Sequence, residues 1–259
     1  MSFQPAPTRS ANIGPANIGP ANIGPAHTGL ANIIEAEHLG KTYKIGKLQV
    51  PALIDVSFAV KPGEFVSIVG PSGSGKSTLF YILGGLTRAT TGHVRIDGVD
   101  FAALSDGERT RMRKTKIGFV FQKFNLLPTL TALGNIEIAH EIAGAGEPLD
   151  RNRLHELTEM LGIGGRLEHR PSELSGGEQQ RVAILRALVT KPAILLADEP
   201  TGNLDTKNSE AVLSMLRHSN KTFGQTVLMI THNPEAAAFA DRTLLMRDGA
   251  LVEPELVGP

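Results

Sequence analysis

Short apolar runs recur along the chain from residue 34 onward, and turn signals or charged segments separate them. Runs of this length that are rich in β-branched and aromatic side chains predict strands. The predicted strands are residues 34–39, 53–60, 65–69, 117–121, 193–199 and 226–231, and residues 93–96 with the turn at Asp97 and Gly98 predict a hairpin. The last two strands are almost wholly apolar, which is typical of parallel strands buried on both faces.

Stretches whose apolar residues fall on one helical face lie between these strands. One of them starts at Asp150, a good capping residue, and closes before Gly162, which favours a helix end. The predicted helices are residues 78–83, 106–116, 133–143, 150–161, 182–189 and 206–218. The alternation of strands and helices predicts an α/β domain, and the helical composition between about residues 123 and 187 predicts an inserted helical subdomain.

The first 33 residues have a different pattern. The pentapeptide at residues 11–15 recurs at 16–20 and 21–25, with proline and glycine in every copy. These residues forbid a helix and offer little apolar area to offset the entropy of ordering, so we expect a disordered tail over residues 1–33. A pentapeptide solenoid is the alternative, but a solenoid needs more stacked repeats than this. The globular domain is expected over residues 34–253, followed by a short tail at 254–259.

Composition narrows the class of protein. The 259 residues are 41% apolar, which is enough for a sizeable core, and 26 basic residues balance 26 acidic ones. This balance gives no argument for a nucleic-acid partner. There are no cysteines, so disulfides and thiolate chemistry are excluded. Because no apolar run approaches the ~18 residues of a membrane span and no signal peptide precedes the domain, we expect a soluble cytoplasmic chain.

The strand at residues 65–69 runs into a segment with the spacing of a phosphate-binding loop. This segment consists of Gly70, Pro71, Ser72, Gly73, Ser74, Gly75, Lys76, Ser77 and Thr78. Glycines let successive backbone N–H groups surround a phosphate, and the following helix adds the positive end of its dipole. Lys76 is predicted to reach the β- and γ-phosphates, and the Ser77 hydroxyl to ligate Mg²⁺. The alternative, an ordinary glycine-rich turn, does not require the flanking strand and helix seen here.

Polar side chains also stand at the carboxyl ends of other predicted strands. Asp198 and Glu199 end one apolar run, and His232 follows another. Open α/β sheets bind their ligands at this edge, so Asp198 suits Mg²⁺ and Glu199 suits a base that orients the attacking water. A lone histidine is usually structural, and only its position recommends His232 as a γ-phosphate contact.

Two further segments are less specific on their own. Ser175, Gly176 and Gly177 form a second anion-binding shape at a helix start, although serine is also simply a good cap. Tyr43 lies between the first two predicted strands, where an aromatic ring would stack on adenine, although a lone tyrosine more often serves packing.

Taken in order, these motifs resemble those of the ATP-binding subunit of an ABC transporter, over about residues 34 to 252. The resemblance implies a P-loop NTPase (RecA-like) core with a mostly parallel sheet, an N-terminal antiparallel β-subdomain and the inserted helical subdomain. It also implies ATP and Mg²⁺ as cofactors, and a head-to-tail homodimer in which Ser175 and Gly177 of one subunit close over the ATP held by Lys76 of the other.

The resemblance also implies a role for each matched residue. The Walker A loop spans Gly70 to Ser77, and the Walker B strand ends in Asp198 and the catalytic Glu199. The nucleotide is contacted by Tyr43 at the adenine, by Thr78 after the loop, by the signature around Ser175, Gly176 and Gly177, and by the D-loop residue Asp205. The Mg²⁺ ligands are Ser77, Gln122 and Asp198, and the hydrolytic group comprises Glu199, His232, Lys76 and Gln122.

A narrower resemblance rests on residues 118–122, 125–128 and 198–205, which are similar to the lipoprotein-release and macrolide-export branch. ATPases of that branch pair with a separate membrane permease subunit, which implies an ATPase that powers transport from the cytoplasmic face of the membrane. The alternative is a non-transport member of the superfamily, such as a cell-division regulator that acts on a membrane partner. Nothing in this chain records the transported substrate.

The segment from Lys123 to Thr131 is the candidate contact with the membrane partner. It carries four apolar residues in a short loop that cannot bury all of them within itself: Phe124, Leu126, Leu127 and Leu130. An exposed apolar cluster of this kind indicates a partner site. The alternative is that these side chains seal the helical subdomain against the core.

Overall fold

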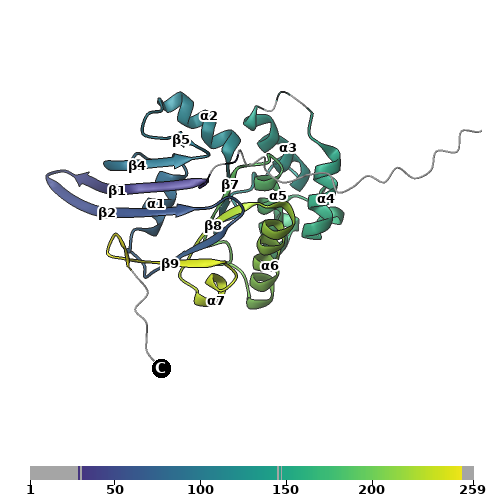
Figure 1. The fold of residues 1–259 in the computed structure, drawn as a ribbon. Helices are drawn as coiled ribbons and strands as arrows, with labels where there is room; N and C mark the ends of the chain where they lie inside the picture. Colours follow the sequence, from purple (N-terminus) through teal and green to yellow (C-terminus); the bar gives the residue numbers. More distant parts are fainter. Residues whose placement is uncertain (1–28, 30, 145, 147, 253–259) are drawn as a thin grey trace, which may run out of the picture.

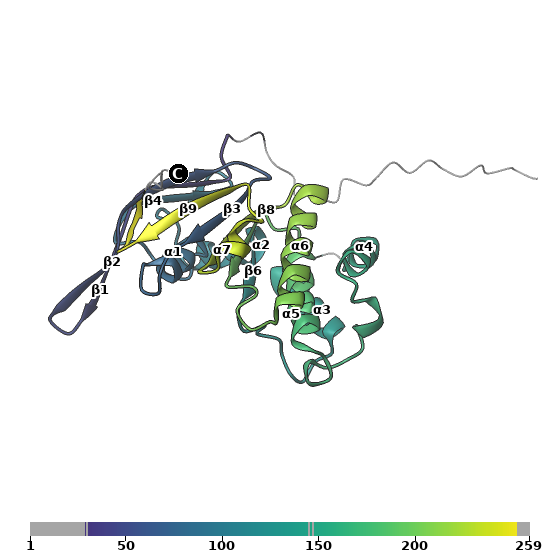
Figure 2. The same cartoon turned by 90° about the horizontal axis from the view of Figure 1, so that it is seen from below.

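The structure is a computed structural model that describes residues 29, 31–144, 146 and 148–252. One of its two sheets is antiparallel and has the strand order β2-β1-β4-β5. Its strands are β1 (Ile34–Ile45), β2 (Leu48–Val60), β4 (Thr91–Ile96) and β5 (Val99–Asp100). This sheet lies along one side of the molecule, and the end of the β1–β2 hairpin projects beyond the rest of the domain (Figure 2).

The second sheet is mostly parallel, with the order β10-β9-β3-β8-β7-β6. Its strands are β3 (Phe65–Val69), β6 (Ile117–Phe121), β7 (Ile194–Asp198), β8 (Thr226–Thr231), β9 (Arg242–Arg247) and β10 (Ala250–Val252). All neighbouring pairs from β9 to β6 are parallel, and only β10 pairs antiparallel. The carboxyl ends of β3, β8, β7 and β6 therefore meet at one edge of the sheet.

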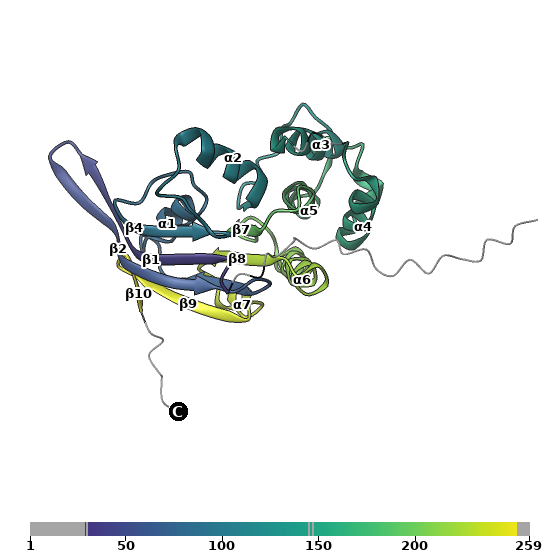
Figure 3. The ribbon, with the colours of Figure 1, turned by 45° about the horizontal axis from the view of Figure 1, so that its top comes forward.

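Helices cover this sheet and form a separate lobe. The helices are α1 (Lys76–Leu83), α2 (Asp106–Lys116), α3 (Ala132–Ala143), α4 (Arg151–Leu161), α5 (Gly176–Leu188), α6 (Thr206–Phe223) and α7 (Pro234–Ala237). Helices α3, α4 and α5 gather at one end of the molecule, away from the antiparallel sheet (Figures 1 and 3). Local sequence fixes where some of these helices begin. At the start of α2, the side chains of Ser105 and Glu108 each accept a hydrogen bond from the other's backbone N–H.

The parallel sheet separates two apolar cores. Along β8, Val227 and Met229 face the core built from α5, α6 and the helical lobe. Leu228 and Ile230 face the other core, which contains α1 and the inner face of the antiparallel sheet. All four side chains are essentially inaccessible to solvent. This alternation explains why the sequence of β8 is apolar at every one of these positions.

The architecture confirms the predicted α/β class with its parallel sheet, antiparallel β-subdomain and helical insertion. The predicted bounds of α2, β6 and β8 agree with the structure. The first two strands were predicted too short, since Tyr43 lies within β1 rather than in a connection. Their outer halves are exposed on both faces and leave no alternation for the sequence to reveal.

Several other bounds also differ, and the largest difference is in α5, which begins at Gly176 rather than at the predicted residue 182. Helix α6 continues five residues beyond the predicted end at residue 218 and stops at Gly224, whose φ of 63° suits a glycine cap. Ile33 was assigned to the tail, but it is 1% exposed and its backbone pairs with Val60 and Asp97. Residues 1–28 and 253–259, which carry the repeats and the C-terminal tail, lie outside the described residues.

Candidate functional site

The phosphate loop connects β3 to α1 at the carboxyl edge of the parallel sheet. Gly73 and Gly75 have φ angles of 81° and 102°, which only glycine adopts readily. A Cβ atom at Gly70 would collide with the carbonyl oxygen of Met246. The sequence therefore needs glycine at these positions both for the turn and for the close approach of β9.

Lys76 is the first residue of α1 and is only 8% exposed. Its Nζ donates hydrogen bonds to the carbonyl oxygens of Gly70 (2.7 Å) and Pro71 (2.9 Å). The ammonium group is thus held across the mouth of its own loop. A positive charge in this position, beside the N-terminus of a helix, suits a bound polyphosphate.

One cavity brings the loop together with the end of β7. It has a volume of about 300 Å³. The sequence-predicted residues that line it are Ser72, Gly73, Gly75, Lys76, Ser77, Thr78, Asp198 and Glu199. Two carboxylates thereby face the phosphate-binding turn across a common space.

Burial raises the pKa of Asp198 above its usual value, and the charge of Glu199 raises it further, while Lys76 acts in the opposite direction. A bound divalent cation would lower the pKa of Asp198 again, because its charge favours the ionised carboxylate. The Ser77 hydroxyl lines the same cavity, so the donor set is oxygen, as Mg²⁺ prefers. Among the described residues no cluster of three or more His, Asp or Glu side chains could hold a metal unaided. A cation here would share its coordination with phosphate oxygens.

Glu199 is held by contacts from β8. The His232 Nδ1 lies 2.7 Å from one carboxylate oxygen, and the Thr231 hydroxyl donates to the other at 3.2 Å. The β7–β8 register pairs Asp198 with Ile230, which places Glu199 beside these two residues. The backbone of Glu199 has a φ of 46°, which is an unusual conformation for a residue other than glycine. The structure therefore places His232 and Thr231 against Glu199, and no sequence pattern had selected Thr231.

Gln122 and Tyr43 are not brought to this cavity. The Gln122 amide lies 3.4 Å from the Asn203 side chain, and Asn203 in turn donates to the Gln122 carbonyl at 2.9 Å. Tyr43 is 38% exposed on β1, with the Lys41 ammonium 5.0 Å from its ring centre. The stacking of Tyr43 on adenine and the ligation of Mg²⁺ by Gln122 both stay predictions.

The signature segment lies at the start of α5, apart from the phosphate cavity of the same chain. Ser175 caps α5 and exchanges hydrogen bonds with Glu178. A hydrogen bond from Arg166, followed by those from Ser175, lowers the pKa of Glu178 to about 2. Gly176 follows the cap, and a Cβ atom at Gly177 would collide with Asn208.

The D-loop residue Asp205 is the cap of α6. Its carboxylate accepts from the backbone and side chain of Asn208, and these bonds lower its pKa. Since Asn208 also closes against Gly177, the D-loop and the signature are packed on each other.

The sequence patterns assigned no individual role to Gln180, although it falls within the signature stretch. It lies on α5 with no solvent exposure and donates to the carbonyls of Pro200 (2.7 Å) and Phe121 (3.4 Å). The helix that begins with the signature is thereby tied to the ends of β6 and β7. The sequence signal for this role is the position of a polar residue on the apolar face of α5, where it needs buried hydrogen-bond partners.

No helix in the described part of the chain is long and apolar enough to cross a membrane. An apolar groove of about 440 Å³ lies between α3, α2 and the end of β6. Of the four apolar residues at 124–130, only Leu127 lines it, with 46% of its surface exposed. Leu126 packs against the core, and Phe124 approaches Gly176 of α5. Leu127 is thus the exposed apolar member of this segment, and its role as a partner contact stays a prediction.

Comparisons with known proteins agree with this geometry. The family profile described as ABC transporter matches residues 53–202. The macrolide export ATP-binding/permease protein MacB of Syntrophobacter fumaroxidans is 47% identical over 226 residues, which is 86% of this chain. The chain spans about a third of that relative, since the match covers 32% of its length.

Other matches extend over nearly the whole relative. The lipoprotein-releasing system ATP-binding protein LolD of Xanthomonas campestris pv. campestris is 45% identical over 223 residues, covering 86% of this chain and 93% of LolD. A solved dimeric structure of the ATP-binding cassette MJ0796, in a post-hydrolysis state with ADP and Pi, has a TM-score of 0.78 at 42% identity. It is matched over 100% of its length and 87% of this chain.

Proposed function

Because this chain belongs to the ABC transporter family of ATP-hydrolysing cassettes, we propose that ATP and Mg²⁺ bind in the cavity between the phosphate loop and the end of β7. The observation that carries this proposal is the convergence of Lys76, Ser77, Asp198 and Glu199 on that one cavity. Lys76 exchanges its contacts with the loop carbonyls for phosphate oxygens, a charge-assisted pairing that is stronger than the one it replaces. Ser77 and Asp198 would hold Mg²⁺, which would supply positive charge to the phosphates. Gln122 joins these ligands only if its side chain leaves Asn203.

Glu199 acts on the water that attacks the γ-phosphate. Its carboxylate is fixed at both oxygens by His232 and Thr231, so it is oriented before any substrate arrives. A positioned carboxylate of this kind accepts a proton from water and aligns it for in-line attack. His232 lies beside it at the same edge and contacts the γ-phosphate.

Substitution of Glu199 tests this assignment. Glu199→Gln is expected to retain ATP binding, because Lys76 and the loop are untouched, and to lose at least about 100-fold in turnover, as general-base removal does. Lys76→Ala should instead weaken nucleotide binding. Glu159→Gln, an exposed change on α4, is the matched control and should hydrolyse ATP normally. A Glu199→Gln protein with wild-type phosphate release in a steady-state assay would refute the proposal.

The catalytic unit is proposed to be a head-to-tail homodimer. The signature residues Ser175 and Gly177 do not line the phosphate cavity of their own chain, yet they form the N-terminus of α5, which suits an anion from elsewhere. In the dimer this terminus closes over the nucleotide held by Lys76 of the other subunit. The dimeric form of the MJ0796 cassette supports the formation of a dimer.

A negative charge introduced at Ser175, the N-cap of α5, tests dimer closure separately from folding. Ser175→Asp keeps a capping residue and places a carboxylate against the partner's phosphates. Because it also loses the hydroxyl bond to Glu178, circular dichroism and thermal unfolding check that the monomer stays folded. We expect this variant to bind ATP and remain monomeric in size-exclusion chromatography, in a Glu199→Gln background that otherwise dimerises with ATP. Dimerisation unaffected by the added charge would contradict the head-to-tail arrangement.

The dimer is proposed to drive a separate integral membrane permease subunit from the cytoplasmic face. The names of LolD and MacB are those of transport proteins, which favours transport over the alternative of a cell-division regulator. The apolar groove beside Leu127 is the surface on which a helix of the permease subunit would dock. Gln122 directly follows Phe121, a strand residue that lines this groove, and its side chain and backbone contact Asn203 of the D-loop.

A further inference from the structure

A smaller cavity of about 100 Å³ lies away from the site of hydrolysis, under the connection from α1 to β4. It is enclosed by this connection, the β4–β5 hairpin and the start of α2, and it shares no lining residue with the phosphate cavity. Among the described residues that line it, only Arg88 and Arg109 carry charge. Phe101 and Val94 form part of its apolar wall.

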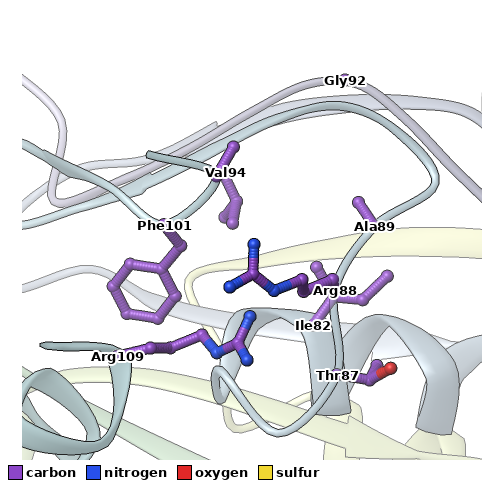
Figure 4. A pocket seen from close by; sticks show the side chains of 9 residues that line it. Ile82, Thr87, Arg88, Ala89, Gly92, Val94, Phe101 and Arg109 are labelled. Carbon is purple, nitrogen blue, oxygen red and sulfur yellow. The ribbon is translucent and has the colours of Figure 1, made fainter. Parts of the chain in front are cut away.

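The two guanidinium groups reach into this space from opposite sides, as Figure 4 shows. Each donates through its Nη2 to the same oxygen of Asp106, at 2.9 Å from Arg88 and 2.6 Å from Arg109. The hydrogen bond from Arg88, and then the charge of Arg109, lower the pKa of Asp106. Asp106 is 82% exposed and does not line the cavity, so one solvated carboxylate faces two converging cations.

The inner part of Arg109 is left with a free donor. Its Nη1 is buried and has no hydrogen-bond partner among the described residues, while the side chain as a whole is 13% exposed. The stem cannot easily swing away, because it passes over Gly85, where even a Cβ atom would lie 3.1 Å from Arg109 Cγ. A buried donor on a charged group without a partner is costly, so a small shift of this guanidinium toward an acceptor in the cavity would stabilise the structure.

Other acidic groups near this cavity are already engaged. The Asp100 carboxylate accepts from the backbone N–H of Ala102 at 2.8 Å and pairs with His93 at 3.0 Å. Two guanidiniums and the one carboxylate of Asp106 leave a net positive charge at the cavity. The volume is several times the roughly 10–15 Å³ that one water needs, so it has room for a tetrahedral anion.

We propose that this cavity is a binding site for a phosphate-sized oxyanion, which bridges Arg88 and Arg109. The ligand is either free inorganic phosphate or the terminal phosphate of a larger molecule, since both present the same oxygens to the two forks. Occupancy joins the C-terminal end of α1 to α2. It therefore braces the helix whose other end carries the phosphate loop.

Thermal unfolding of the full chain tests the site with inorganic phosphate as the probe. The protein is saturated with Mg²⁺ and a non-hydrolysable ATP analogue, so that the phosphate loop is occupied, and sodium chloride of equal ionic strength is the reference. At ten times the dissociation constant, binding to the native state should raise the melting temperature by about 3–6 °C. Arg109→Met keeps the stem over Gly85 and should abolish this rise. Arg111→Met, at an exposed position of the same helix, should retain it.

Glycerol phosphate distinguishes free phosphate from the terminal phosphate of a larger molecule. It should raise the melting temperature only if the cavity admits a phosphate monoester. Arg88→Met provides a second variant that should also lose the response. A crystal of the wild-type protein soaked in tungstate should show an anomalous peak between the two guanidiniums, which requires no variant to fold. The proposal is overturned if wild type gains nothing over chloride, if Arg109→Met responds as wild type does, or if tungstate is absent from the cavity.

Discussion

Asn135 holds the segment that leads to the apolar groove, and its removal is the most informative test of that surface. It is fully buried in the first turns of α3. Its Oδ1 accepts from the Leu127 N–H at 2.7 Å, and its Nδ2 donates to the carbonyls of Leu127 (3.1 Å) and Thr131 (2.9 Å). One side chain thus replaces the regular backbone pairing that the segment lacks.

The cost of Asn135→Ala follows from which groups keep a partner. The Leu127 carbonyl still accepts from Leu130 N–H and the Thr131 carbonyl from Asn135 N–H, so both remain paired. The Leu127 N–H loses the only partner recorded for it among the described residues. This hydrogen bond is only part-buried, so its loss costs about 0.5–1.5 kcal/mol. With the small void left by the side chain, we expect a loss of about 1–3 kcal/mol in the free energy of unfolding.

Urea unfolding of the full chain measures this loss, and amide hydrogen exchange locates it. Asn152→Ala is the matched control, because Asn152 is exposed on α4 and its removal should change stability by less than about 0.5 kcal/mol. In Asn135→Ala the Leu127 amide should exchange much faster than in wild type, while amides of β8 keep their relative protection. The reasoning is refuted if both variants unfold at the same urea concentration and the Leu127 amide stays protected.

Two further predictions concern the partner groove and the response to pH. Leu127→Asp should leave the basal ATPase activity of the isolated protein within about twofold, because Leu127 is 46% exposed and touches no phosphate-site residue. The same variant should fail to co-purify with the membrane partner, and normal assembly would place the docking surface elsewhere. Hydrogen bonds from Arg166 and then from Ser175 lower the pKa of Glu178 from 4.5 to about 2. The ionised carboxylate therefore contributes stability above its usual pKa, and this stability is lost as the pH falls through that window. Glu178→Gln should therefore be less stable than wild type at neutral pH, with the difference shrinking toward pH 2 in urea unfolding; a difference independent of pH would contradict this origin.

The sequence by itself determined the local features of this protein. The phosphate loop is readable because its glycines, Lys76 and Ser77 follow from chain-local requirements of backbone conformation and phosphate contact. The strands buried on both faces are readable because their neighbours leave no place for polar residues, and their ends therefore identified Asp198 and Glu199. Helix α2 was predicted within its observed bounds, since its cap and its charges lie within the helix itself.

Only the tertiary structure decided how these segments meet. The pairing of Glu199 with His232 and Thr231 depends on the register between two strands that are about 30 residues apart, which no local pattern encodes. The hairpin at Tyr43 was underestimated because its outer half is exposed on both faces, so no hydrophobic alternation marks it. Buried polar residues such as Asn135 have no periodic signature either. Their partners are backbone groups that the fold leaves unpaired, and those groups exist only once the chain has closed around them.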